Sequence, residues 1–259
     1  MSTTSLTEDA IVLKNGYKTF QTDVDQPTYV LKNVDLTIKK GEFYILLGPS
    51  GCGKSTLLNI IAGFSDLSIG DLQIVTSNKE RDGRGFVFQS ADSALFPWLT
   101  VEENISFGLK MKKVPAAERK KIANTYIKLT GLTGHGEKFP DNLSGGMKQR
   151  VQLARVLANE PEVLLMDEPF GALDAMTRRT MQNELIRIWR ETNKTVIFVT
   201  HDIQEAIILG QKIGIMSVGP GSRIDTSYEV DLSYPRDITT VEFNQYYKQV
   251  QAHFEDYSI

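Results

Sequence analysis

An eight-residue segment, GPSGCGKS at positions 48–55, limits the possible folds of this chain more than any other feature. A short apolar run at 44–47 precedes it, and the pattern of residues 55–62 predicts a helix directly after it. A strand, a glycine-rich loop and a helix in this order hold phosphate, because inward-turned backbone N–H groups and a helix N-terminus attract anions. The segment therefore predicts an α/β fold with a nucleotide-binding loop.

The spacing G-x-x-x-x-G-K-[ST] of this loop gives its polar side chains specific tasks. Lys54 is expected to reach the β- and γ-phosphates, and the Ser55 hydroxyl is expected to bind Mg²⁺. The guanine-specific sequence Asn-Lys-x-Asp does not occur, because other residues follow Asn-Lys at 78–79 and 193–194. The residues expected to contact the nucleotide here are Gly48, Pro49, Ser50, Gly51, Cys52, Gly53, Lys54, Ser55 and Thr56.

A second apolar run, residues 163–166, ends in two carboxylates, Asp167 and Glu168. At the carboxyl end of a strand, Asp167 can hold Mg²⁺ through water, beside the loop of Lys54. Glu168 points in a different direction and can orient or deprotonate an attacking water. Two adjacent acids could also be a solvated strand end, but their occurrence together with the glycine-rich loop favours the catalytic interpretation.

The remaining pattern predicts how the chain is organised. Strands alternating with helices imply a mostly parallel sheet covered on both faces. Residues 92–160 are expected to form a mostly helical subdomain, inserted into a nucleotide-binding α/β core of residues 1–91 and 161–225. A helical tail is expected at 226–259, and the whole chain is expected to be one domain.

Composition narrows the function further. The 259 residues are 24% charged with a net charge of −3, which argues against disorder and against a nucleic-acid partner. The single cysteine, Cys52, excludes an intrachain disulfide and fits a reducing cytoplasm. No signal-peptide core is present, and no apolar run approaches the roughly 20 residues that span a bilayer. If the protein acts at a membrane, we expect another chain to cross it.

A serine and two glycines begin the second predicted helix of the insertion, in the segment LSGGMKQ at 143–149. Ser144 alone would be an ordinary helix cap, but capping does not explain Gly145 and Gly146, which destabilise a helix. Backbone N–H groups at such a helix start form a second anion site. The segment resembles the signature of the ABC transporter ATPases, which most often reads LSGGQ.

Other positions match this family in the family's order. Gln89, at the end of a strand, resembles the Q-loop glutamine, and residues 171–174, GALD, resemble the D-loop. His201, after the apolar strand at 196–199, resembles the switch histidine. The resemblance covers about residues 10–220 and implies a P-loop ATPase fold with an antiparallel N-terminal β region, and ATP and Mg²⁺ as cofactors.

The resemblance also implies a mechanism. Two such domains face head to tail, and each ATP lies between the Lys54 loop of one copy and the signature of the other. Glu168 is then the general base, His201 contacts the γ-phosphate, Gln89 senses Mg²⁺ and the water, and Asp174 lies at the dimer interface. The implied Mg²⁺ ligands are Ser55, Gln89 and Asp167. The signature residues implied to contact ATP across the dimer are Leu143, Ser144, Gly145, Gly146 and Met147.

In this family an aromatic residue near the N-terminus stacks on the adenine. Tyr17 and Phe20 are the candidates, and on a regular strand they face opposite ways because they lie three positions apart. Tyr17 shares its face with Ile11 and Leu13, which is typical of a core position. Phe20 follows Lys-Thr at the place where the family carries its aromatic residue, so we predict that Phe20 stacks on the adenine.

Two segments resemble one group within the family. Residues 147–150, MKQR, and residues 95–100, LFPWLT, are similar to sequences of the taurine, sulfonate and nitrate importers. Trp98 either packs within its own loop or forms a wall for the membrane partner, since aromatic residues are favoured at interfaces. The resemblance implies an ATPase that energises import of a small anion.

The partners implied by the resemblance are membrane-spanning permease subunits, a second copy of this chain or a sister ATPase, and an external substrate-binding protein. The expected place is the cytoplasmic face of the inner membrane, as a peripheral subunit. Two alternatives stay open: an exporter or lipoprotein-releasing motor with the same core, and a soluble ABC ATPase of DNA maintenance or translation. Relatives of the second kind carry long coiled coils or tandem units, and this sequence shows neither heptads nor repeats.

Overall fold

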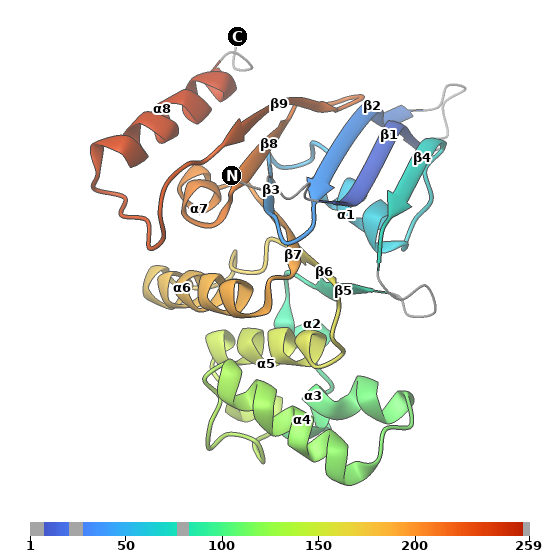
Figure 1. Ribbon diagram of the computed structural model, residues 1–259, viewed down its shortest axis with the longest axis vertical. Helices are drawn as coiled ribbons and strands as arrows, with labels where there is room; N and C mark the ends of the chain where they lie inside the picture. The colour runs from blue at the N-terminus through green and yellow to red at the C-terminus, as the bar shows by residue number, and fades with distance from the viewer. Residues whose placement is uncertain (1–7, 21–27, 77–82, 256–259) are drawn as a thin grey trace, which may run out of the picture. The chain divides into compact units, whose positions relative to one another are not determined.

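The computed structural model describes residues 8–20, 28–76 and 83–255. The chain forms two compact units, one made of Met1–Glu80 with Asn193–Ile259 and the other of Arg81–Thr192. In sequence, the second unit is therefore an insertion into the first. Each unit combines strands and helices (Figure 1).

The first unit begins with an antiparallel sheet in the order β2-β1-β4. The central strand β1 (Asp9–Phe20) lies between β2 (Thr28–Lys39) and β4 (Ile69–Ile74), as Figure 1 shows. Buried and exposed residues alternate along most of β2, which is the pattern of a sheet that packs one face on a core. The predicted antiparallel N-terminal β region is confirmed.

A second sheet of the first unit leads into the glycine-rich loop. β3 (Phe43–Leu47) pairs in parallel with β7 (Thr195–Thr200) on one side and with β8 (Lys212–Met216) on the other. Every residue of β3 and β7 is buried, as expected of parallel strands that are covered on both faces. β9 (Ile224–Glu229) pairs antiparallel with β8. The predicted parallel core sheet is confirmed, with an antiparallel strand added to it.

The helices of the first unit are α1 (Lys54–Ala62), α7 (Ile203–Leu209) and α8 (Val241–Glu255). α1 follows β3, and α7 follows β7, as the sequence predicts. α8 lies beside α7; Figure 1 draws α7 in orange and α8 in red. The helical tail expected over 226–259 is therefore corrected: its first residues belong to β9, which pairs with β8, and the helix begins only at Val241.

In the second unit, β5 (Arg84–Val87) and β6 (Val163–Asp167) form a parallel pair. α6 (Ala175–Thr192) follows them in the chain, and its residues Met181, Leu185 and Ile188 are buried.

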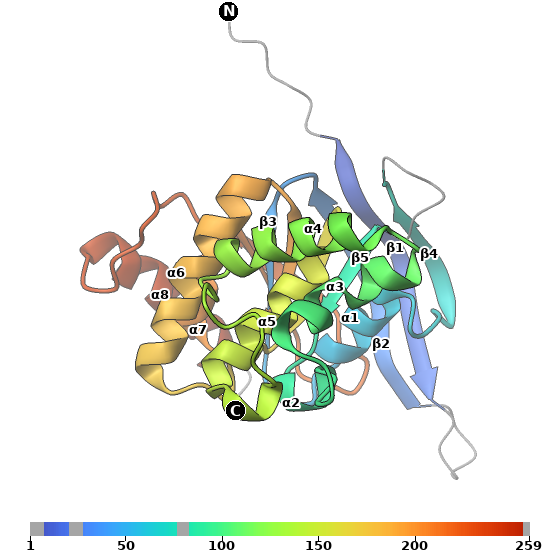
Figure 2. The same ribbon diagram turned by 90° about the horizontal axis from the view of Figure 1, so that it is seen from below.

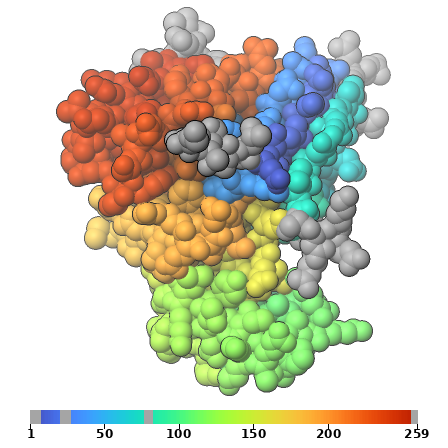
Figure 3. Space-filling view, in the orientation of Figure 1, coloured from blue at the N-terminus to red at the C-terminus, as the bar shows by residue number. Residues whose placement is uncertain are grey.

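The part of this unit between β5 and β6 is helical. α3, α4 and α5 pack against one another (Figure 2), and Figure 3 shows this green part of the chain as one continuous surface. Their common core includes Val101, Ile105, Ile127 and Val151. The helical elements are α2 (Ala91–Ala94), α3 (Val101–Met111), α4 (Ala116–Leu129), a 3-10 turn at Pro140–Asn142 and α5 (Gly145–Leu157). The subdomain boundaries at 91/92 and 160/161 stay a prediction, and the compact units divide at 80/81 and 192/193.

Candidate nucleotide site

The glycine-rich loop joins β3 to α1 in the first unit. Gly51 and Gly53 have φ values of 82° and 94°, a region that glycine adopts without the steric cost of a side chain. Gly53 is the N-cap of α1 and has no side chain to satisfy the first turn. Thr100 and Ser144, by contrast, accept hydrogen bonds at the N-termini of α3 and α5. The N-terminus of α1 is thus suited to an anion in the place of a capping side chain.

Lys54 is folded back over this loop. Its side chain is only 4% exposed, and Nζ donates hydrogen bonds of 2.8 Å to the carbonyl oxygens of both Gly48 and Pro49. These contacts hold the ammonium group against the loop backbone. A phosphate in the loop would therefore meet a positive charge that is already in position.

His201 lies at the same edge of the sheet as the start of the loop. Leu47 of β3 is paired with Thr200 of β7. Gly48 and His201 are the residues that directly follow this pair, so both lie at the same end of the two strands. The side chain of His201 is exposed. The first unit therefore brings together the phosphate loop and the predicted switch histidine.

The segment around His201 is fixed on both sides. Asp202 caps α7 by accepting a hydrogen bond of 3.1 Å from the backbone N–H of Glu205. The hydroxyl of Thr200 donates to the Glu205 carboxylate at 2.6 Å and accepts from the backbone N–H of Asp202 at 3.1 Å. The residues that flank His201 are thus linked to one another and to the first turn of α7.

Phe20 ends β1 with its ring 48% exposed and with Lys18 Nζ 5.2 Å from the ring centroid. The prediction that Tyr17 shares a core face with Ile11 and Leu13 is wrong, because the register of β1 shifts near Asn15, whose φ is 50°. As a result Gly16 is buried, whereas Tyr17 is half-buried and meets Tyr29 edge-on at 6.2 Å. Phe20 remains the predicted adenine contact on the grounds of its exposure and its place in the sequence.

In the second unit, Gln89 and Glu168 occupy equivalent places at the carboxyl edge of a strand pair. Val87 is paired with Met166, and each of the two polar residues follows two positions later. A Cβ added to Gly171 would lie 3.5 Å from the carbonyl oxygen of Glu168 and 3.8 Å from Nε2 of Gln89. The structure therefore brings the Gln89 side chain to the turn that follows the two predicted catalytic carboxylates.

Glu168 itself has a φ of 41°, in the left-handed region that residues with a Cβ seldom adopt. Such a conformation costs on the order of 1–3 kcal/mol and is often found at functional sites. It turns the chain sharply after β6, so that Asp167 and Glu168 do not follow the alternation of a strand. This geometry agrees with the prediction that the two carboxylates have different tasks.

Gln149 connects this acidic turn to the signature helix, a role that the sequence did not reveal. It is buried in α5, and its Nε2 donates a short hydrogen bond to the carbonyl oxygen of Pro169, one residue after Glu168. The residue belongs to the segment LSGGMKQ. A polar side chain on the buried side of this amphipathic helix was the one sequence signal that it has a specific hydrogen-bond partner.

The predicted signature residues divide into two groups. Leu143 is buried in the helical core, and Met147 packs against that core. Ser144 and Gly145 are exposed, and the Ser144 hydroxyl accepts a hydrogen bond of 3.4 Å from the backbone N–H of Met147. Gly146 is buried, and a Cβ there would come within 2.5 Å of Cγ2 of Thr177. The exposed surface of the motif is therefore the serine and the first glycine.

Asp174 lies next to this motif in the second unit. Its neighbour Leu173 has Cδ2 3.9 Å from the position of a Cβ on Gly145. The Asp174 carboxylate is exposed and accepts hydrogen bonds from the backbone N–H groups of Met176 at 3.1 Å and of Thr177 at 3.0 Å. Hydrogen bonds from Thr177, first of all from its side chain, hold the pKa of Asp174 below its usual value. The carboxylate therefore stays ionised and fixed beside the start of α6.

An aromatic cluster, defined by Phe96, Trp98 and Phe107, stands apart from these motifs. The ring of Phe96 lies 4.4 Å from that of Phe107 and 5.5 Å from that of Trp98, and the Arg155 guanidinium lies 4.4 Å from its centroid. The side chain of Trp98 is 69% exposed. The buried amide of Asn104 bonds the backbone of this loop, accepting from the N–H of Phe96 and donating to its carbonyl oxygen. A rigid loop thus presents a large apolar ring to solvent.

No helix in the described part of the chain is both long and apolar enough to serve as a membrane span.

The pattern of the family described as "ABC transporter" matches residues 31–171. The taurine import ATP-binding protein TauB of Pelagibacter ubique is 46% identical over 224 residues, which cover 85% of this chain and 83% of that protein. The aliphatic sulfonates import ATP-binding protein SsuB of Bacillus subtilis is 46% identical over 228 residues, 87% of each protein.

Solved structures with a similar fold include a dimeric ATP-binding cassette in a post-hydrolysis state bound to ADP and Pi. It has a TM-score of 0.73 and 36% identity, and the match covers 86% of this chain and 100% of that one. A Clostridium perfringens protein that is part of the ABC transporter complex cbiONQ has a TM-score of 0.77 and 27% identity, and the match covers 97% and 100% of the two chains. The predicted fold class is confirmed by these structures.

Proposed function

The chain belongs to the ABC transporter family as an ATP-binding subunit whose ATP hydrolysis is coupled to transport, and we propose that it powers the import of a small sulfonate or a similar organic anion. The observation that carries the proposal is the phosphate loop with Lys54 in place, in a chain 46% identical to import ATP-binding proteins for taurine and for aliphatic sulfonates. The segments LFPWLT at 95–100 and MKQR at 147–150 support the same group.

We propose that hydrolysis depends on a division of tasks among the motif residues. Lys54 and the N-terminus of α1 bind the phosphates, Glu168 takes a proton from the attacking water, and His201 contacts the γ-phosphate. Gln89, beside the turn after Glu168, orients that water. Phe20 stacks on the adenine through its exposed ring.

Mg²⁺ is the metal that these residues fit. The proposed ligands, Ser55, Gln89 and Asp167, offer hydroxyl, amide and carboxylate oxygens, which a hard cation prefers. Within residues 8–20, 28–76 and 83–255, no group of three or more His, Cys, Asp or Glu side chains is arranged to hold a metal. That agrees with an ion bound mainly by nucleotide phosphates and water, with one or two protein carboxylates. When bound, the ion neutralises charge on the β- and γ-phosphates.

We further propose that two copies of this chain enclose ATP head to tail. The exposed Ser144 and Gly145 of one copy would face the nucleotide held by the phosphate loop of the other, where backbone N–H groups at the start of α5 favour an anion. Asp174 would lie at the same interface, next to the signature. The dimeric cassette among the similar solved structures supports this arrangement.

We propose that the membrane partner is a separate permease. The surface of this chain that contacts the permease is proposed to include the aromatic cluster of Phe96, Trp98 and Phe107. A ring as exposed as that of Trp98, on a loop held by Asn104, is suited to a protein interface. We propose that the chain is a peripheral subunit on the cytoplasmic face of the membrane and that an external binding protein delivers the anion to the permease.

The test is purification of the chain from its native membrane in mild detergent, followed by mass spectrometry of the complex. We expect a multi-span protein in stoichiometric amounts. The complex is then reconstituted in liposomes with an external binding protein from the same organism, and taurine, alkanesulfonates and nitrate are screened for stimulation of ATPase activity. Recovery of the chain with only soluble partners would contradict the transport proposal. Stimulation by nitrate, a cation or a sugar, and by neither taurine nor the alkanesulfonates, would contradict the substrate class.

A further inference from the structure

Helix α7 is held at its C-terminal end by the segment that follows β9, defined as the clamp segment, residues 230–236. The hydroxyl of Tyr234 donates to the carbonyl oxygen of Leu209 at 2.6 Å. Nη1 of Arg236 donates to the carbonyl oxygens of Ile207 and Gly210, both at 2.5 Å. The last carbonyl groups of a helix have no partner within the helix, so these side chains supply what the helix lacks.

Arg236 is unusual because it is a buried cation that is bound by backbone carbonyls. Its side chain is 8% exposed, and besides α7 it donates to the carbonyl oxygens of Leu232 and Val230, each at 3.1 Å. Its guanidinium lies 4.2 Å from the ring centroid of Tyr234. Burial lowers the pKa of Arg236 from its usual value. Only a planar, fixed set of donors such as the guanidinium group reaches all these oxygens. The single ammonium group of a lysine could not do so.

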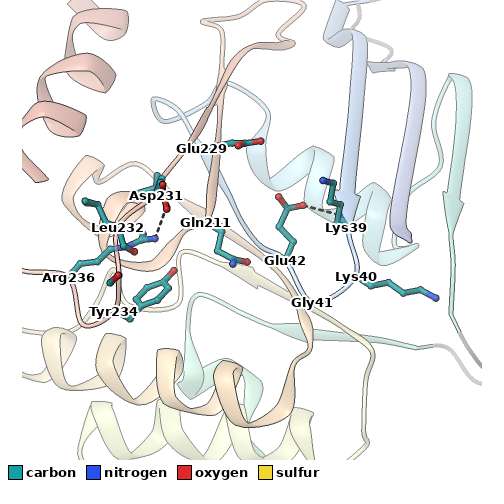
Figure 4. Close-up of a pocket in the computed structure, with 12 residues that line it drawn as sticks. Lys39, Lys40, Gly41, Glu42, Gln211, Glu229, Asp231, Leu232, Tyr234 and Arg236 are labelled. Atoms are coloured by element: carbon teal, nitrogen blue, oxygen red, sulfur yellow. Dashed lines mark hydrogen bonds between the residues drawn. The ribbon is translucent and has the colours of Figure 1, made fainter. Parts of the chain in front are cut away.

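The clamp segment also lines a cavity of about 600 Å³. Figure 4 draws Tyr234 and Arg236 among the residues that line it. Lys40, Glu42 and Gln211 line it together with residues of the clamp segment. The hydrogen bonds of Arg236 and Tyr234 attach the segment to α7.

The clamp segment is itself anchored by α8. The hydroxyl of Tyr246 accepts a hydrogen bond of 3.1 Å from the backbone N–H of Asp231, and Phe243 and Val250 of α8 are fully buried. The C-terminal part of the chain thus forms a fixed support, and the clamp joins it to α7.

The opposite end of α7 begins two residues after His201. Asp202 caps this end, and the Thr200–Glu205 hydrogen bond of 2.6 Å spans the His201 position from β7 to the helix. With only seven residues, α7 has few bonds of its own to hold it. A displacement at its C-terminus would consequently move its N-terminus and the backbone of His201.

We propose that Arg236, assisted by Tyr234, is a positioning residue for ATP hydrolysis: the C-terminal part of the chain sets the place of α7 and, through it, of His201. The proposal rests on the role assigned to His201 above. It gives a task to the C-terminal residues, which contain none of the nucleotide motifs.

The experiment measures ATPase kinetics of the full chain with Arg236→Met, Arg236→Lys and Tyr234→Phe, each alone and combined with His201→Ala. We expect Arg236→Met to lower kcat by about 10-fold or more and Tyr234→Phe by about threefold, with little change in nucleotide affinity, because only an alignment is lost. Arg236→Lys should resemble Arg236→Met. In the His201→Ala background, neither change should lower the rate further. The matched control is Tyr247→Phe, which removes a hydroxyl of α8 that bonds neither α7 nor the clamp segment.

Nucleotide binding, measured by fluorescence titration, separates misfolding from misplacement. Tyr234→Phe keeps the ring and loses one hydrogen bond, so it tests the proposal even where Arg236→Met does not fold. Rate losses that add to that of His201→Ala, or a Tyr234→Phe variant with the wild-type kcat, would overturn the positioning role alone. A His201→Ala variant that retains the wild-type rate would instead overturn the assignment of His201, and the positioning role with it.

Discussion

The hydroxyl of Thr200 and the carboxylate of Glu205 are joined by a hydrogen bond of 2.6 Å, and both side chains are buried. The bond links the last residue of β7 to the first turn of α7, and His201 lies between its two ends in the chain. His201, the predicted γ-phosphate contact, therefore lies in a short segment whose two ends are hydrogen-bonded to each other.

Replacing Thr200 by Val should weaken this segment. The change keeps the shape of the side chain but removes the donor to a buried carboxylate, which costs about 1–3 kcal/mol of unfolding free energy. Urea denaturation of the nucleotide-free chain measures the loss. Thr200→Ser keeps the hydroxyl and should lose clearly less; a Val variant as stable as the wild type, or more stable than the Ser variant, would show that packing, and not the hydrogen bond, dominates.

Glu168 combines a chemical task with an unfavourable backbone conformation, and two substitutions should separate them. Glu168→Gln and Glu168→Asn both remove the proposed base, so we expect the ATPase rate to fall by about 100-fold or more in each. Asn tolerates a positive φ better than Gln. The Asn variant should therefore be the more stable of the two to urea. A Gln variant with the wild-type rate would contradict the assignment of the base.

The two signature glycines should respond differently to alanine. At Gly146 the new methyl group would lie 2.5 Å from Cγ2 of Thr177, whereas at Gly145 the nearest neighbour is Leu173 Cδ2 at an ordinary 3.9 Å. Gly146→Ala should therefore lower the unfolding free energy by about 1–3 kcal/mol, as overpacking does, while Gly145→Ala should not. Thr177→Ser removes the clashing methyl and should restore stability to Gly146→Ala. Absence of rescue would mean that the clash is not the cause.

Removal of divalent cations should stop hydrolysis without unfolding the chain. Mg²⁺ is proposed to bind chiefly to nucleotide phosphates, so EDTA should leave the melting temperature of the nucleotide-free chain unchanged. With ATP present, EDTA should reduce both the thermal stabilisation by nucleotide and the ATPase rate, and added Mg²⁺ should restore them. A fall in melting temperature without nucleotide would reveal a structural metal instead.

Trp98 should affect coupling and not the chemistry of ATP. Trp98→Ala removes a ring that is 69% exposed, so the ATPase activity of the isolated chain should stay near the wild-type value. Binding to the permease, measured by co-purification, should fall by about 10-fold or more if the ring is an interface anchor. Met111→Ala, which removes another exposed apolar side chain, is the control, and an equal effect of both would contradict a specific contact.

The sequence predicted most elements of the fold because their patterns are local. The β3–loop–α1 unit follows from one motif, and β7 follows from the apolar run before His201. β9 was missed because its half-buried face includes Thr226 between Ile224 and Tyr228, so that its alternation is weak. The bulge near Asn15 was missed for a similar reason, since a register shift depends on pairing with β2.

Predictions for the site were sharpest where a motif assigns each atom a task, as in the phosphate loop. Arg236 and Gln149 could not be assigned in that way. Both act through backbone carbonyl oxygens of segments distant in the sequence, at positions 207 and 210 for Arg236 and at 169 for Gln149. Partners of this kind are created by folding, and the residue types alone do not identify them.

The insertion of the second unit into the first has a consequence for how the chain is made. Gly41, just before β3, donates a hydrogen bond to the Thr195 hydroxyl, 154 positions later, and both neighbours of β3 in its parallel sheet come after the inserted unit. During synthesis, the strand that leads into the phosphate loop must therefore wait for its partners until most of the chain has left the ribosome. Pairing over such separations is slow, and the waiting strand is wholly apolar. We expect the nascent chain to need protection from aggregation until β7 and β8 emerge.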